Sequence, residues 1–256
     1  ISPAGRICWP ISTNEVDNMD CNFNRVRLCG RISSDPALSH VNHGETFYRF
    51  VLSVQRLSGQ CDDLPVIVPR QLLRACPLGR GDAAAVTGQL RSFNNRSGQG
   101  RRLIISVFAQ TLERGSGVPC NRIQLGGSLC KPPNYRRTPL GREICDLILA
   151  VNRRYGRADY LPCIAWGAVA QQTRSLTVGA PLCLEGRVQS RVYTKNLGTY
   201  AEERTAYEVS IMRPAELEEF LPEPPPEPSA DFVRSAKSEN FLLTNGGADG
   251  IVPSNR

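Results

Sequence analysis

The sequence predicts a mainly β protein made of two copies of one small domain. Three observations lead to this prediction: an internal repeat, short segments in which apolar and polar residues alternate, and glycine-rich breaks between these segments. At 256 residues the chain has room for two modest domains. Each copy is therefore expected to bury a core of its own.

The repeat consists of similar blocks in the same order. Four blocks recur at an offset of 97 or 98 residues: 24–30 at 121–127, 51–56 at 148–153, 64–68 at 161–165 and 88–92 at 186–190. Ser106 matches Ser210 at an offset of 104, which predicts a longer final hairpin in the second copy. Blocks in one order at nearly one spacing indicate a duplicated domain.

Each copy contains five predicted strands. In the first copy they are expected at 24–33, 47–56, 64–68, 83–92 and 102–112. A helical turn is expected at 71–76, between the third and fourth strands, and again at 168–176 in the second copy. Five strands with a helix in this position are the arrangement of the OB-fold, a partly open barrel. The predicted fold is thus all-β in the main, with two tandem five-stranded OB-fold barrels.

Composition divides the chain into four parts. Residues 1–20, in which the first Met is Met19, are expected to be a disordered extension. Residues 21–116 and 117–214 are predicted to be the first and second OB-fold domains. Residues 215–256 are rich in proline and acidic residues and are expected to form a disordered tail, with PEPPPEP at 222–228 as an extended spacer.

The positive charge lies on the two repeated bodies. Residues 19–116 carry 13 Lys/Arg against 7 Asp/Glu, and residues 117–214 carry 14 against 7. The tail carries 3 against 8. Two basic bodies favour a polyanionic partner, whereas the alternative is a basic surface that serves only solubility.

At the repeated blocks the sequence resembles the bacterial single-stranded DNA-binding protein (SSB) family. The resemblance covers roughly residues 22–214 and is best in the second copy. The residues that carry it are NRIQLGG at 121–127, LAVNR at 149–153, YLPCIAWG at 160–167 and GRVQSRVY at 186–193. The first copy departs more, because VIVP at 66–69 replaces the run that ends in Trp166.

The resemblance implies which side chains stack on bases and which contact phosphates. Stacking on an aromatic ring tolerates any base, and a cationic groove tracks the backbone. The implied stacking residues of the second copy are Tyr155, Tyr160, Trp166 and Tyr193, although Tyr160 or Trp166 could instead complete the barrel core. The nearby cations are Arg153, Arg154, Arg187, Arg191 and Lys195.

The first copy has fewer aromatic residues at the matching positions. It keeps Phe93 near the place of Tyr193 and supplies the candidate cations Arg56, Arg91 and Arg101. We therefore expect the second copy to bind strongly and the first to contribute charge, weaker contacts or assembly. The arginines of the first copy could also be scattered solubilising charges.

The remaining residues do not indicate an enzyme or a metal site. The ten Cys form no C-x-x-C pair, and the two His, His40 and His43, stand in one loop without further ligands. Nucleophile-elbow and phosphate-loop motifs are absent, so neither a catalytic residue nor a cofactor is expected. No apolar stretch is long enough to span a bilayer. We expect a reduced, cytoplasmic protein of bacterial or phage origin.

The expected function is sequence-tolerant binding of single-stranded DNA in replication, repair and recombination. By the resemblance, two OB domains per chain suggest a homodimer with four, and replication or repair proteins are possible partners. Two alternatives stay open: an accessory replication or primosome protein that acts mainly by docking other proteins, and an OB protein that binds RNA.

Overall fold

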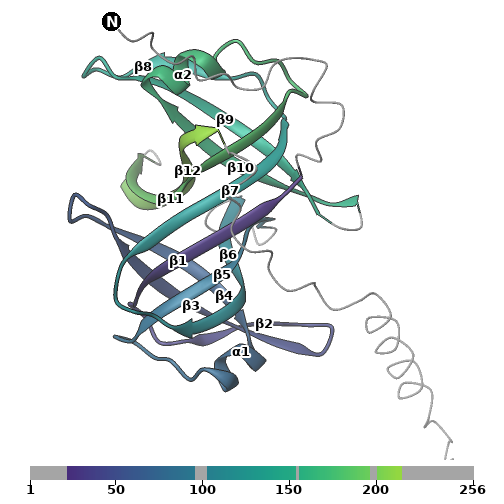
Figure 1. Cartoon of the computed structure of the whole chain (residues 1–256), viewed down its shortest axis with the longest axis vertical. Helices are drawn as coiled ribbons and strands as arrows, with labels where there is room; N and C mark the ends of the chain where they lie inside the picture. Colours follow the sequence, from purple (N-terminus) through teal and green to yellow (C-terminus); the bar gives the residue numbers. More distant parts are fainter. Residues whose placement is uncertain (1–21, 96–102, 154–155, 197–200, 215–256) are drawn as a thin grey trace, which may run out of the picture.

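The computed structural model of the chain describes residues 22–95, 103–153, 156–196 and 201–214 (Figure 1). The strands of the first half are β1 (Asn24–Ile32), β2 (Ala37–Asn42), β3 (Glu45–Gln55), β4 (Cys61–Pro69), β5 (Ala83–Asn94) and β6 (Leu103–Arg114), with helix α1 at Arg70–Ala75. Those of the second half are β7 (Cys120–Leu129), β8 (Asn134–Arg137), β9 (Glu143–Asn152), β10 (Ala158–Trp166), β11 (Pro181–Asn196) and β12 (Ala201–Pro214), with helix α2 at Gly167–Thr173.

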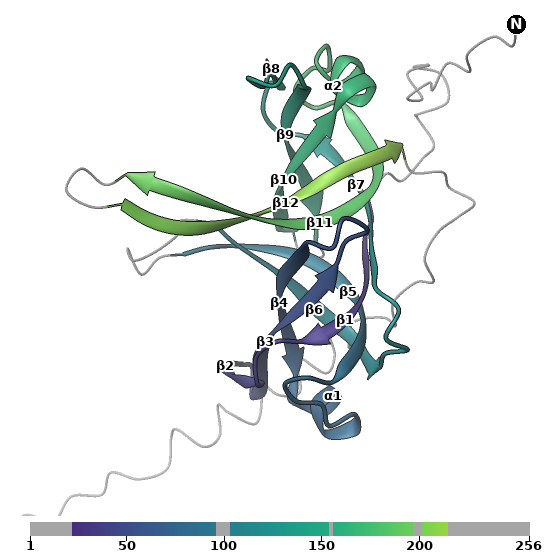
Figure 2. The ribbon, with the colours of Figure 1, turned by 90° about the vertical axis from the view of Figure 1, so that its left-hand side faces the viewer.

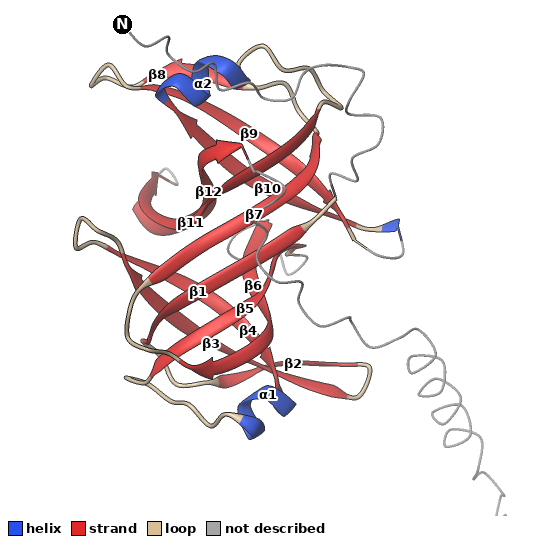
Figure 3. Cartoon of the chain, in the orientation of Figure 1, coloured by secondary structure: helices blue, strands red, loops and turns tan. Residues whose placement is uncertain are grey.

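Each half closes into a five-stranded barrel. In the first half the neighbouring strands run β1-β3-β4-β6-β5 and return to β1. In the second half they run β7-β9-β10-β12-β11 and return to β7. Helices α1 and α2 each follow the third strand of their barrel and lie at opposite ends of the molecule (Figure 3). The predicted mainly β, OB-type architecture is confirmed.

Glycine is required where the fourth strand of each barrel crosses the fifth. A β-bulge precedes Gly88 in β5 and Gly186 in β11. A Cβ added to Gly88 would lie 2.0 Å from the carbonyl oxygen of Phe108, and one added to Gly186 would lie 2.2 Å from that of Ser210. Because any side chain would meet the backbone there, the repeated glycine permits the sharp coiling that closes the barrel.

The asparagine that opens each repeat ties the first strand to the fourth. The side-chain amide of Asn24 donates to the carbonyl of Leu90 at 2.7 Å and accepts from its N–H at 2.8 Å. Asn121 makes the same two bonds with Val188, at 2.7 and 2.9 Å. This pair of bonds gives a physical reason for the recurrence of Asn at an offset of 97.

The two barrels share one sheet across a seam formed by β1 and β7. These strands pair antiparallel, and Val26 lies opposite Ile123. Since residues 26 and 123 are themselves repeat equivalents, the seam has approximate two-fold symmetry. Figure 1 shows β1 and β7 side by side between the two barrels. Buried apolar side chains on both strands, such as Leu28 and Leu125, belong to one continuous core cluster.

Several details differ from the sequence prediction. Strands β2 and β8 were not expected; every residue of β2 is exposed, so it carries no alternating apolar signal. Helix α2 ends at Thr173, earlier than predicted. In the final strands Val107 pairs with Val66, and Val209 pairs with Cys163, the repeat equivalent of Val66. Val209 is therefore the equivalent of Val107, at an offset of 102. The predicted match of Ser106 with Ser210, at an offset of 104, is wrong by two residues.

The expectation that all cysteines are reduced is wrong at one position. Cys183 in β11 is disulfide-bonded, whereas the other seven cysteines of the described residues are free. The predicted extension at 1–20 and tail at 215–256 lie outside the described residues. Neither described helix is long and apolar enough to cross a membrane.

Candidate nucleic-acid interface

Two buried aspartates join the barrels, one on each side of the seam. Asp62 in β4 accepts a hydrogen bond from the backbone N–H of Ser190 in β11, at 2.8 Å. It also accepts one from Nε of Arg56, at 2.7 Å. The Asp62 side chain is 0% exposed, and its hydrogen bond raises the pKa of Arg56. We call this group, Asp62 with Arg56 and Ser190, the Asp62 clasp.

The second group repeats the first with the halves exchanged. Asp159 in β10 accepts hydrogen bonds from the backbone N–H of Ser92 in β5, at 2.5 Å, and from Nε of Arg153, at 2.6 Å. Arg91 adds an ion pair to the same carboxylate, at 3.4 Å. Asp159, Arg153 and Ser92 are the repeat equivalents of Asp62, Arg56 and Ser190. We call this group the Asp159 clasp.

A cavity of about 710 Å³ lies beside the Asp62 clasp. Both halves line it: the first with Arg56, Gln60, Cys61 and Asp63, the second with Arg142, Trp166, Arg187, Gln189, Ser190, Arg191, Val192, Thr205, Tyr207 and Ser210. Four arginines face one acidic residue, Asp63, among these lining residues. The cavity is therefore cationic and carries two aromatic rings.

Arg187 is the partly buried cation of this cavity. Its Nε is buried and has no hydrogen-bond partner. Among the described residues, neither Arg187 nor Arg142 forms an ion pair, and Arg191 reaches Glu208 at only 3.7 Å. A partly exposed guanidinium that forms no ion pair is suited to bind an anion such as a phosphate.

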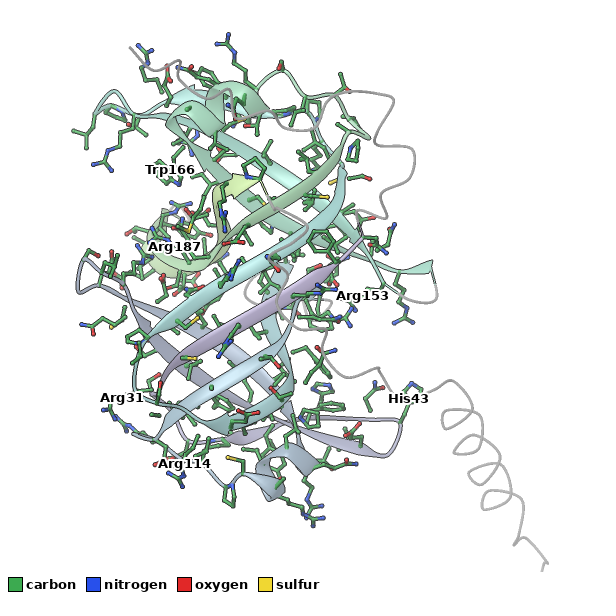
Figure 4. The ribbon with its side chains drawn as sticks, viewed as in Figure 1. Arg31, His43, Arg114, Arg153, Trp166 and Arg187 are labelled. Atoms are coloured by element: carbon green, nitrogen blue, oxygen red, sulfur yellow. The ribbon has the colours of Figure 1, made fainter. Side chains whose placement is uncertain are left out.

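Trp166 and Tyr160 are exposed and do not complete the barrel core. In β10 the core positions are taken by Leu161, Cys163 and Ala165. Trp166 is 38% exposed at the end of that strand, and Tyr160 is 49% exposed near its start. Figure 4 shows Trp166 and Arg187 on one side of the molecule and Arg153 on the opposite side.

Three predicted phosphate-binding arginines are engaged in the clasps. Arg56 pairs with Asp62, while Arg153 and Arg91 pair with Asp159. Arg153 also donates to the carbonyl of Ser92, at 3.0 Å. The position of these side chains is set by the seam, so much of their hydrogen-bonding capacity is already used.

The Asp159 clasp brings together predicted stacking residues of different halves. Phe93 follows Ser92, is 39% exposed, and has the guanidinium carbon of Arg153 5.3 Å from its ring centre. Tyr160 follows Asp159 and donates its backbone N–H to Oγ of Ser92, at 2.8 Å. The first copy thus supplies its aromatic residue beside the second copy's Tyr160, which the sequence analysis did not foresee.

The remaining predicted residues belong to the hairpin of β11 and β12. Figure 2 shows this hairpin and that of β5 and β6 extending from the same side of the body. Tyr193 lies in β11, with the guanidinium carbon of Arg191 5.8 Å from its ring centre. Lys195 also lies in β11, but its side chain is outside the described part. Arg101, Arg154 and Tyr155 lie outside the described residues.

Sequence reasoning missed the lining residues that come from other elements. Arg142 stands before β9 and Tyr207 lies in β12, where no motif marks them. Gln60, Cys61 and Asp63 come from the first half. Only the contact of the two halves at the seam brings these three residues next to the second barrel.

The chain is similar in sequence to known single-strand binding proteins. The model of the Single-strand binding protein family matches residues 120–214. The chain is 34% identical over 128 residues to Single-stranded DNA-binding protein 2 of Listeria monocytogenes, a match that covers 47% of this chain and 72% of that protein. It is 26% identical over 212 residues to the Single-stranded DNA-binding protein of Deinococcus radiodurans, covering 69% of this chain and 70% of the relative.

The fold has counterparts among solved structures. The wild-type single-stranded DNA binding protein from Thermus aquaticus superposes with a TM-score of 0.59 at 22% identity, covering 82% of this chain and 98% of that one. A deletion mutant of the same protein gives a TM-score of 0.60 at 24% identity, covering 80% and 100%. These structures agree in fold, and with the similarity in sequence they lead to one conclusion: the chain belongs to the single-strand binding protein family.

Proposed function

We propose that this protein binds single-stranded DNA with little sequence preference. The observation that carries the proposal is the cationic cavity, in which the exposed Trp166 stands among Arg142, Arg187 and Arg191. Bases would stack on the ring of Trp166, and phosphates would contact the arginines. Phe93 and Tyr160, beside the Asp159 clasp, would form a second stacking surface, to which Tyr193 is also proposed to contribute. Lys195, Arg101, Arg154 and Tyr155 are proposed as further contacts.

The names of the relatives support this choice of ligand. The Listeria and Deinococcus proteins are both named single-stranded DNA-binding proteins. We accordingly place this chain among proteins that act on exposed strands in replication, repair and recombination, through binding and without catalysis. No specific observation favours RNA binding or the docking of primosomal proteins.

We further propose that each barrel is one domain, with the boundary in residues 115–119, and that two chains associate. A homodimer would contain four OB barrels. Strands β2 and β8 stand at the two ends of the sheet and so offer edges for such pairing. Sedimentation of the full chain tests this, and a monomer at micromolar concentration would contradict it.

Titration of intrinsic fluorescence with oligo-dT tests the proposed ligand. We expect strong quenching by the single strand, a weak response to duplex DNA, and an affinity that falls with salt at a slope of about −0.7 per phosphate contact. Replacement of Trp166 by Ala should weaken binding by about tenfold or more, since stacking contributes roughly 1–3 kcal/mol per base.

Two variants serve as controls. Trp166→Phe keeps an aromatic face and should retain much of the affinity. Val178→Ala removes another exposed apolar side chain, between α2 and β11 and outside the cavity lining, and should change nothing. Absence of binding by the unmodified protein at low salt would overturn the proposal.

A further inference from the structure

Two cysteines face each other across the seam between the barrels. Cys29 in β1 lies directly opposite Cys120 in β7, at the last pair of the ladder that joins these strands. Opposed residues of antiparallel strands have Cα atoms roughly 4.5–5.5 Å apart. Disulfides span about 4.4–6.8 Å between Cα atoms, so this separation falls in the range that a disulfide bridges.

The side chains of this pair also interact. The neighbouring Cys29 thiol raises the pKa of Cys120, and the sulfur of Cys120 lies 4.0 Å from the carbonyl oxygen of Arg27. Neither cysteine belongs to the apolar core cluster, in contrast to Cys145 and Cys163. Cys29 is buried and Cys120 is half-buried, so Cys120 is the more accessible thiol of the two.

The pair is not a product of the duplication. The repeat equivalent of Cys29 is Gly126, and that of Cys120 is Phe23. A covalent link between residues 29 and 120 would occur once in the chain and would join the two barrels directly. It would close a loop that contains almost the whole first half.

We propose that Cys29 and Cys120 form a redox-sensitive thiol pair that closes to a disulfide across the seam. Arg27 and Arg122 lie opposite each other in the same ladder, two positions from the cysteines. Their positive charges favour an anionic disulfide, such as oxidised glutathione, as the oxidant. The thiolate of one cysteine attacks this disulfide and releases one glutathione. The second cysteine then attacks the mixed disulfide and releases another, so two protein thiols are oxidised while one glutathione disulfide is reduced.

The thiol form is the resting state at neutral pH. Burial raises the pKa of Cys120, and the neighbouring Cys29 acts in the same direction, while Arg27 and Arg122 oppose it. Because a protonated thiol is a poor nucleophile, closure needs oxidised glutathione and is slow even when this oxidant is present. Closure constrains the unfolded chain through a long loop and should stabilise the attachment of the two barrels.

Peptide mapping of the full-length protein tests the proposal. After incubation with oxidised glutathione and blocking of free thiols, trypsin should release residues 28–31 linked to residues 115–122, with a mass two hydrogens below the sum of the two peptides. Dithiothreitol should separate them. Oxidation should raise the Tm of the unmodified protein by several degrees and leave the Tm of Cys120→Ser unchanged.

Controls distinguish this pair from other thiols. Cys61→Ser removes an exposed thiol and should leave the link and the rise in Tm intact. If oxidant produces only mixed disulfides, or links other cysteines while residues 28–31 and 115–122 stay separate, the proposal is wrong. Cys29→Ser provides a second variant, in which the link must also disappear.

Discussion

The carboxylate of Asp62 accepts a hydrogen bond from the backbone N–H of Ser190, 128 residues away in the other barrel, at 2.8 Å. Asp159 accepts the corresponding bond from Ser92. These two bonds fix where the third strand of one barrel meets the fourth strand of the other. The cationic cavity and the exposed aromatic residues stand beside them, so the clasps connect the stability of the seam with the candidate binding surface.

Replacement of Asp62 by Ala should destabilise the protein by about 3 kcal/mol, because it leaves the Arg56 guanidinium and the Ser190 N–H without their buried acceptor. Urea unfolding measures the change. Asp146→Ala is the matched control: it breaks an arginine–carboxylate pair in which both side chains are substantially exposed. That variant should lose about 0.5 kcal/mol. Equal losses in the two variants would contradict a structural role for the clasp.

Phe93 and Tyr160 should act together in binding, although they belong to different repeats. If one segment of a single strand contacts both rings, the double variant Phe93→Ala/Tyr160→Ala should depart from additivity by about 0.5–1 kcal/mol in oligo-dT affinity. The pair Phe93→Ala/Val178→Ala should be additive, because Val178 belongs to neither clasp and is outside the cavity lining. Additivity in both cycles would show that the two rings contact the strand independently.

Asp63→Asn should strengthen binding of single-stranded DNA. Asp63 is the acidic member of the cavity lining, and removing its charge removes repulsion of about 1 kcal/mol or less toward a nearby phosphate. The expected gain is a few-fold at low salt, and it should shrink as salt increases. Asp35→Asn alters an acid outside the lining and should have no such effect. A weaker affinity for Asp63→Asn would place the DNA elsewhere.

Glu143 should make the outer end of the second barrel sensitive to acid. Hydrogen bonds from Arg137, Gln171 and Tyr135 lower the pKa of Glu143 to about 2, from an ordinary value of 4.5. The ionised carboxylate is favoured in the folded state, so its stabilisation is present above about pH 4.5 and is lost as pH falls toward 2. The Tm of the unmodified protein should exceed that of Glu143→Gln at pH 6, and the difference should vanish near pH 2. A difference that persists there would exclude this cause.

Local residue patterns were sufficient to predict much of the architecture. The repeat of Asn24 at Asn121 and of Gly88 at Gly186 reflects requirements within a single barrel, namely the amide bonds between two strands and the close crossing of two backbones. Such requirements act over one domain and recur whenever the domain is copied. Strand β2 escaped prediction because an edge strand with both faces in water needs no alternating pattern.

The candidate site also has features that the sequence identified and others that depend on the tertiary structure. The sequence by itself determined that the chain holds two OB-type barrels, that they are basic, and that Trp166, Tyr160 and Phe93 are candidates for stacking. Only the tertiary structure decided that Arg56 and Arg153 bind Asp62 and Asp159, that Arg187 is left unpaired, and that Cys29 faces Cys120. The physical reason is that charge neutralisation and thiol pairing depend on which residues meet across the seam, and this follows from the packing of one barrel on the other.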